Sequence, residues 1–84
     1  MNYEVSILRR AQRQLAAFDR TIRSRIQPVL ISLSENPRPP GSRKLSGRDG
    51  WRIRIGDYRV IYEINDEALT ITVLDIGHRK DIYR

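Results

Sequence analysis

Residues 51–59 read WRIRIGDYR, and this stretch decides the fold because apolar and cationic side chains alternate on both sides of a Gly-Asp turn at 56–57. A two-residue hairpin loop with glycine first places Arg54 directly opposite Arg59. One face of the predicted hairpin then carries Arg52, Arg54 and Arg59. The other face is apolar and carries Trp51, Ile53, Ile55, Tyr58, Val60 and Tyr62.

The predicted pair of Arg54 and Arg59 is unfavourable, because like charges directly opposite in a sheet destabilise it by a few tenths to about 1 kcal/mol. An anionic ligand on this face would offset the repulsion. Glu63, which is diagonal to Arg52, and Asp57 could instead neutralise part of the charge on a solvated surface. The hairpin alone leaves both interpretations open.

Composition restricts the class of protein. The 84 residues are expected to form one domain, residues 1–84, with one core. A formal net charge of +6 and a pI near 10.5 favour nucleic acid or an acidic protein as partner. The absence of cysteine and the single histidine argue against a disulfide framework and a metal centre. Since no apolar run could serve as a signal peptide or a membrane span, the sequence predicts a soluble cytoplasmic protein without membrane contacts.

Helical periodicity dominates the first half of the chain. An N-terminal strand is predicted to end at Ser6, which suits a helix N-cap. Apolar residues then recur at helical spacing, and Asp19 divides them into a helical hairpin of about 7–17 and 20–35. Pro28 predicts a kink or a restart of the second helix. Solvated surface is expected for the outer arginines Arg9, Arg10, Arg13, Arg20, Arg23 and Arg25.

The second half predicts a meander of strands. Residues 36–41 are rich in proline and form a loop, and residues 43–45 follow as a short edge strand. A second turn at 65–68 lets Ile64 pair with Leu69. This register adds Leu69, Ile71 and Val73 to the apolar face. It adds Ile61 and Leu74 to the arginine face.

The chain ends in a polar segment after Gly77. This glycine would let the chain leave the last strand and bring His78, Arg79 and Tyr83 towards the rim of the arginine face, with fraying of the segment as the alternative. Together these elements predict an α+β fold. It consists of an N-terminal strand, a helical hairpin and an antiparallel meander of three to four strands, with the helices packed on one face of the sheet.

Three segments carry a resemblance to a known family: NPRPPGSRKLSG at 36–47, GWRIRIGDYRVIYEI at 50–64 and VLDIGHRKDIYR at 73–84. In this order and spacing they resemble the RelE branch of the RelE/ParE toxin superfamily, the toxins of bacterial and archaeal toxin-antitoxin pairs. The resemblance covers essentially the whole chain, which is therefore expected to be a single RelE-like toxin domain.

The resemblance implies a type II toxin that acts as an endoribonuclease, cleaves mRNA in the ribosomal A site and inhibits translation. The implied partners are mRNA, the ribosome and a cognate antitoxin, which would cover the arginine face with Ile61 and Leu74; no metal and no small-molecule cofactor is implied. Position by position, the family's active residues match Arg52, Arg54, Arg59, Arg79 and Tyr83. The best-known members have lysines at the first two positions and a further helix after the tyrosine, whereas this chain ends at Arg84.

Arginine suits the stabilisation of a transition state in this reaction, because its guanidinium binds phosphate oxygens bidentately and stays charged. RNA cleavage without a metal also requires a base for the 2′-hydroxyl and an acid for the 5′-oxygen. The candidates are His78, Tyr83 and Lys44, of which His78 titrates nearest to neutral pH. Stacking on an RNA base is the alternative role of Tyr83. Further RNA contacts are expected from Lys44, Arg43, Arg48 and Lys80.

Two other functions stay open. The ParE branch shares the fold and acts on DNA gyrase, but its members generally do not keep together the set Arg52, Arg54, Arg59, Arg79 and Tyr83. The second alternative is a basic domain that binds RNA or an acidic protein without any chemistry.

Overall fold

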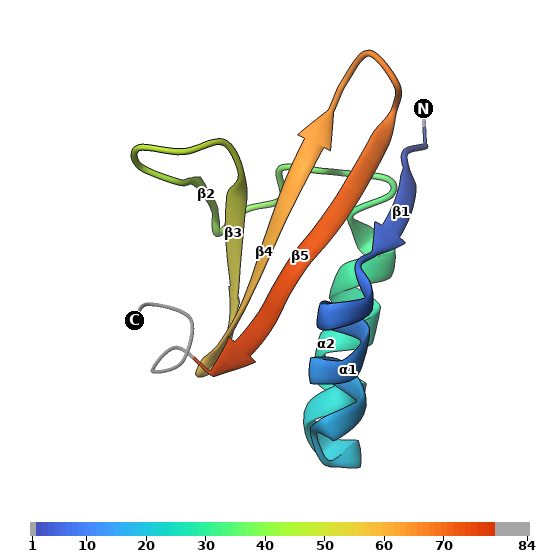
Figure 1. The fold of residues 1–84 in the computed structure, drawn as a ribbon, viewed down its shortest axis with the longest axis vertical. Coiled ribbons are helices and arrows are strands. Elements are labelled where there is room, and N and C mark those ends of the chain that lie inside the picture. The colour runs from blue at the N-terminus through green and yellow to red at the C-terminus, as the bar shows by residue number, and fades with distance from the viewer. Residues whose placement is uncertain (1, 79–84) are drawn as a thin grey trace.

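Figure 1 shows the computed structural model of the chain, which describes residues 2–78. Five strands form one sheet in the order β1-β5-β4-β3-β2. Strand β1 runs parallel to β5, and all other neighbouring strands are antiparallel. The elements in chain order are β1 (Glu4–Ile7), α1 (Arg9–Ala17), α2 (Arg20–Ser32), β2 (Ser42–Lys44), β3 (Trp51–Ile55), β4 (Tyr58–Asn65) and β5 (Thr70–His78).

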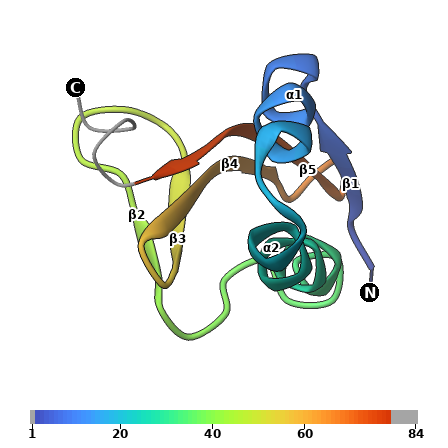
Figure 2. The ribbon, with the colours of Figure 1, turned by 90° about the horizontal axis from the view of Figure 1, so that it is seen from below.

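The predicted α+β class and the meander of strands are confirmed. The parallel pairing of β1 with β5 was not indicated by the sequence, because it joins residues as distant as Val5 and Ile71. Both helices lie at the β1–β5 end of the sheet, and β2 and β3 lie at the other end (Figure 2). Within residues 2–78, neither helix is long and apolar enough to cross a membrane.

Helix α1 begins later than predicted. Ser6 belongs to β1 and does not cap the helix, because residues 4–7 pair with β5 and only Leu8 remains as the N-cap position, without a side-chain capping bond. The second predicted cap is confirmed, since Oδ1 of Asp19 accepts a hydrogen bond of 3.1 Å from the amide of Ile22. The helical hairpin therefore divides where the sequence predicts.

Pro28 does not end or restart α2, which runs through it from Arg20 to Ser32. Pro28 and Ser24 are both exposed, so water can hydrate the Ser24 carbonyl that proline leaves without an N–H donor. Arg23 was expected to be solvated, but its guanidinium donates a hydrogen bond of 2.6 Å to the Phe18 carbonyl, at the turn between the two helices.

One core joins the helices to a single face of the sheet, which we call the helix-covered face. Ile53, Val60 and Tyr62 lie on it. They share one core with the buried residues Ala11 and Leu15 of α1, Ile26 and Leu30 of α2, and Leu33 at the C-cap of α2. The ring of Tyr62 is fully buried, and its hydroxyl donates 2.7 Å to the carbonyl of Pro37. The proline-rich loop is thereby fixed to the centre of the sheet.

The hairpin between β3 and β4 has the predicted register, with Arg54 opposite Arg59. The second hairpin differs: Ile64 pairs with Ile71 and not with Leu69, which lies in the turn at a φ of 55°. The loop keeps the predicted four residues but lies one residue later, at 66–69, because Asn65 pairs with Thr70. Oδ1 of Asn65 accepts a hydrogen bond of 2.9 Å from the amide of Ala68 and stabilises this turn.

Strand β5 also contains a bulge that the sequence did not indicate. Tyr62 pairs with Val73 but Ile61 pairs with Asp75, so Leu74 is an extra residue in β5. The alternation of faces is reversed beyond this point. Val60 pairs with Ile76 and Arg59 with Gly77, which places Ile76 in the core and Gly77 on the opposite, open face.

Candidate active site

The open face of the sheet contains a cationic cavity of about 320 Å³. Strand β3 supplies two of its arginines, and β4 and β2 supply one each. The lining residues are Gly41, Arg43, Arg52, Arg54 and Arg59. The structure thus brings together the three arginines of the predicted hairpin and adds Arg43, which pairs with Arg52 across β2 and β3.

The arginines are held by the strands and by local bonds. Nε of Arg54 donates 2.8 Å to the carbonyl of Gly56, which draws this side chain towards the hairpin turn. Arg52 and Arg59 are half-buried, whereas Arg43 and Arg54 are exposed. The cavity therefore presents guanidinium groups from three strands whose backbone positions are set by sheet pairing, which limits the reorganisation needed to bind an anion.

Ile61 lies beneath this cationic surface and not on it. It is opposite Arg52 on the open face, yet it is only 3% exposed. The prediction that Ile61 forms an apolar patch for an antitoxin is therefore wrong. Leu74, its expected companion, is the half-buried extra residue of the bulge.

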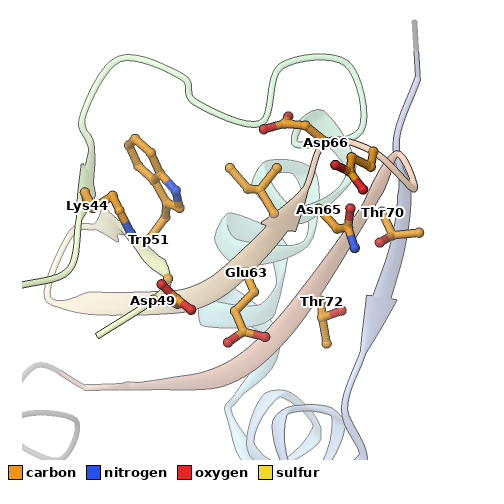
Figure 3. A pocket seen from close by; sticks show the side chains of 11 residues that line it. Lys44, Asp49, Trp51, Glu63, Asn65, Asp66, Thr70 and Thr72 are labelled. Carbon is orange, nitrogen blue, oxygen red and sulfur yellow. The ribbon is translucent and has the colours of Figure 1, made fainter. Parts of the chain in front are cut away.

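Lys44 lies away from the arginines. It is the β2 neighbour of Arg43, so strand alternation turns it to the face of Trp51, its partner in β3. It lines a second hollow of about 630 Å³ near the turn between β4 and β5, where Figure 3 shows it with Glu63 and Asp66. The structure therefore separates Lys44 from the cavity, and it places Glu63 beside this second hollow and not among the cavity-lining arginines.

Asp66 at the second hollow belongs to a polar cluster that ties four parts of the chain together. Its carboxylate accepts a hydrogen bond of 2.9 Å from the guanidinium of Arg38 and one of 2.6 Å from the hydroxyl of Tyr3. These two hydrogen bonds hold the pKa of Asp66 below its ordinary value of 3.8, and the bond from Arg38 has the larger effect. The guanidinium of Arg38 also lies 5.1 Å from the ring centre of Trp51. The cluster holds these segments together, and none of its residues is among those that line the arginine cavity.

His78 lies on the helix-covered face, so the prediction that it reaches the rim of the arginine face is wrong. Its ring meets Tyr58 edge-on at 5.5 Å, and Tyr58 in turn meets Phe18 at 5.0 Å. The bulge is the cause, because β5 continues through Gly77 and the reversed alternation pairs His78 with Tyr58. The placement does not support His78 as the general base.

The remaining predicted residues are less informative. Arg48 is exposed in the loop between β2 and β3. Outside the described residues lie Arg79, Lys80 and Tyr83. Arg25 is exposed, as expected, and its Nη1 lies 3.9 Å from the position that a Cβ atom would occupy on Gly56. No sequence signal could locate it there, because the contact depends on how α2 meets the hairpin. Among residues 2–78, no group of three or more His, Cys, Asp or Glu side chains could hold a metal ion.

Comparison with known proteins assigns the chain to a family. Residues 5–83 match the family described as the ParE toxin of the type II toxin-antitoxin system parDE. The chain belongs to this toxin family. The toxin is 34% identical to toxin RelG of Mycobacterium tuberculosis, over the whole of this chain and 99% of the relative. It is 24% identical to the mRNA interferase toxin RelE of Escherichia coli K12, over 95% of this chain and 86% of the relative.

Solved structures agree with this assignment. The archaeal RelE-RelB complex from Pyrococcus horikoshii contains a chain that superposes on the toxin with a TM-score of 0.84 and 30% identity, over 96% of the toxin and 99% of that chain. The predicted membership of the RelE/ParE superfamily of toxin-antitoxin pairs is therefore confirmed.

Proposed function

We propose that the toxin is an endoribonuclease that cleaves mRNA in the ribosomal A site and thereby stops translation. The observation that carries the proposal is the cavity on the open face, where Arg43, Arg52, Arg54 and Arg59 meet. Four permanent positive charges suit a polyanion whose phosphate oxygens accept bidentate hydrogen bonds. A relative of similar length is named an mRNA interferase, which supports RNA as that polyanion.

In this proposal the arginines stabilise charge on the phosphoryl group. The 2′-hydroxyl oxygen attacks the adjacent phosphorus, the bond to the 5′-oxygen breaks, and negative charge grows on the non-bridging oxygens. Guanidinium groups on β3 and β4 are positioned before RNA binds, so they can stabilise this charge with little reorganisation. Arg79 would join them from the C-terminal segment.

Proton transfer is assigned differently from charge stabilisation. Arginine remains protonated because its pKa stays above about 12, and it cannot serve as an efficient base. His78 and Lys44 are turned away from the cavity-lining arginines. Tyr83 remains the candidate for proton transfer or base stacking, and alignment of the RNA supplies the larger part of the rate. Neither a metal nor a cofactor takes part in this scheme.

The partner that controls the toxin in the cell is proposed to be a cognate antitoxin. Solved relatives of similar fold come from toxin-antitoxin complexes, those of Mycobacterium tuberculosis and Pyrococcus horikoshii. An acidic antitoxin segment over the open face would neutralise the arginines and exclude RNA. The ribosome would supply the mRNA in a splayed, single-stranded form that the cavity can reach.

Cleavage in a reconstituted translation mixture tests this function. Arg59→Ala and Arg52→Ala should each lower the cleavage rate by about a hundredfold to a thousandfold, the usual effect of removing one donor to a developing oxyanion. Arg9→Ala and Arg20→Ala remove the same charge from exposed helix positions and serve as matched controls. Undiminished cutting by both cavity variants would end the assignment, and a selective loss in the helix variants would move the site to the helices.

A gyrase assay distinguishes the second candidate function. The family match carries the name ParE, which favours testing gyrase as an alternative target. Inhibited supercoiling without new mRNA ends would identify a ParE-type activity. Salt-sensitive RNA binding without new ends or gyrase inhibition would identify a binding module.

A further inference from the structure

The outer edge of β5 changes its neighbour near the bulge. Pairing with β1 ends at Val73, whose carbonyl accepts a hydrogen bond of 3.0 Å from the amide of Leu8. A strand edge beyond this point presents backbone groups that need new partners. Gln14 of α1 supplies one of them, since its Oε1 accepts a hydrogen bond of 2.8 Å from the amide of Ile76. Its Nε2 also donates a hydrogen bond of 2.6 Å to the side-chain Oδ1 of Asp75.

These two bonds lie directly after the extra residue Leu74. Gln14 therefore contacts the two residues that follow the bulge, through one backbone group and one side chain. Asp75 also forms an ion pair of 3.4 Å with Arg10, one turn earlier on the same helix. Helix α1 thus holds β5 in its bulged register from the side.

The consequence of the bulge can be worked out from the register. If the pairing of Tyr62 with Val73 continued without an extra residue, Val60 would pair with Asp75 and Arg59 with Ile76. A one-residue slip moves every later side chain to the other face. The carboxylate of Asp75 would then face the core, and the side chain of Ile76 would stand beside Arg59 on the open face.

The observed register avoids both outcomes. Ile76 is fully buried in the core, and Gly77 is the β5 residue opposite Arg59. Glycine has no side chain, so β5 places nothing on the open face beside this arginine. The bulge therefore places a glycine, which is itself buried, and not the side chain of Ile76 opposite Arg59. Bulges next to active sites commonly re-aim side chains in this way.

We propose that Gln14 is a positioning residue for the arginine cavity, acting through the bulge that its two hydrogen bonds hold in β5. This inference rests on the proposed function in that the cavity is taken as the RNA site. Gln14 itself touches neither the cavity nor the RNA. Its effect reaches Arg59 through β5, by fixing which residue of this strand lies opposite.

The test compares Gln14→Leu, which removes both bonds, with Gln12→Leu as the matched control. Gln12 is also a glutamine of α1 and donates 2.7 Å to a backbone carbonyl, but that carbonyl belongs to Ile7 in β1. In Gln14→Leu we expect amide exchange at Ile76 to accelerate by about tenfold or more. The cleavage rate kcat should fall by about tenfold to a hundredfold while KM changes by less than about threefold, because misplacement affects the transition state more than RNA binding.

A rescue experiment separates positioning from general damage to the fold. In the double variant Gln14→Glu with Asp75→Asn, the new carboxylate at position 14 accepts hydrogen bonds from the Ile76 amide and from the new side-chain amide at position 75. Both hydrogen bonds return, and in the second one the donor and the acceptor have exchanged places. This pair should recover Ile76 protection and most of kcat, whereas Gln14→Glu alone sets two carboxylates together and should not. Recovery would also show that a poorly folding Gln14→Leu variant failed for lack of the bonds.

Register can be read without cleavage, which separates this inference from the proposed function. Cross-strand NMR contacts between Arg59 and Gly77, and the Arg59 Nε–Hε resonance, report the bulge and the cavity directly. If the wild type cuts no RNA, the proposed function fails, but loss of these signals in Gln14→Leu with return in the rescue pair still supports positioning. Unchanged contacts, resonance and exchange in Gln14→Leu, or changes no larger than in Gln12→Leu, overturn it.

Discussion

The repulsion between Arg54 and Arg59 can be measured by a double-mutant cycle with Arg54→Gln and Arg59→Gln. The two residues are directly paired across β3 and β4. Each single variant also loses other contacts, such as the bond from Arg54 to the Gly56 carbonyl, so the single changes in stability do not isolate the repulsion. The cycle cancels these separate losses and leaves the coupling between the two side chains.

The expected coupling has a definite sign and size. Either single substitution relieves the repulsion completely. The sum of the two single-variant stability changes therefore counts this relief twice, whereas the double variant gains it only once. The double variant should therefore be less stable than additivity predicts, by a few tenths to about 1 kcal/mol. For a domain of this length, a difference of 1 kcal/mol corresponds to about 4 to 8 °C in Tm.

Urea and thermal unfolding at two salt concentrations provide the assay. The Debye length is about 30 Å at 0.01 M salt and about 3 Å at 1 M, so the coupling should shrink strongly at the higher concentration. Inorganic phosphate should raise the Tm of the wild type more than that of either single variant, since a ligand of the folded state stabilises it in proportion to binding.

Two results would refute the reasoning about this pair. Additivity within about 0.3 kcal/mol at low salt would mean that the guanidinium groups do not repel each other measurably. A coupling of the opposite sign, or one that salt leaves unchanged, would mean that the pair is held by something other than charge. In either case the cavity would not be a preformed electrostatic site for phosphate.

Two further predictions concern the framework around the site. Tyr62→Phe should lower the free energy of unfolding by about 1 to 3 kcal/mol, because it leaves the buried Pro37 carbonyl without its donor. Urea unfolding measures the change, with Tyr58→Phe, which removes the same atom from a half-buried ring, as the control. Equal losses of stability in the two variants would contradict the reasoning. Asp66 has a pKa below 3.8 in the folded state, so the stability it contributes is full above this value and is lost as pH falls through the folded-state pKa. The stability difference between wild type and Asp66→Asn should therefore be larger at about pH 7 than at about pH 2, and a difference independent of pH would contradict it.

The local parts of the fold could be predicted because their determinants are close in sequence. The Gly56-Asp57 turn sets the pairing of Arg54 with Arg59, and alternation along each strand then sorts arginines from core residues. Asp19 caps α2 through an amide three residues away. Three of the four arginines of the cavity could be grouped from this turn alone.

The errors have a common origin in contacts between distant segments. Ser6 does not cap helix α1 because β1 continues past it in its pairing with β5. Lys44 lies on the opposite face from the arginines because it pairs with Trp51 in β3. His78 was expected on the arginine face because Gly77 was predicted to let the chain leave the last strand, but β5 continues through Gly77 to His78. The bulge at Leu74 reverses the alternation of faces along β5, and nothing in the neighbouring sequence marks it.

The hairpin of residues 51–59 and its cationic face follow from local sequence alone, since a short turn and a period of two suffice to specify both. The tertiary structure alone decided what stands beside that face. Gln14 lies 62 residues from Ile76, and the bond between them exists only after α1 has packed along β5. That contact holds the bulge, turns His78 to the helices and leaves Gly77 opposite Arg59, because a slip of one residue in a strand exchanges its two faces.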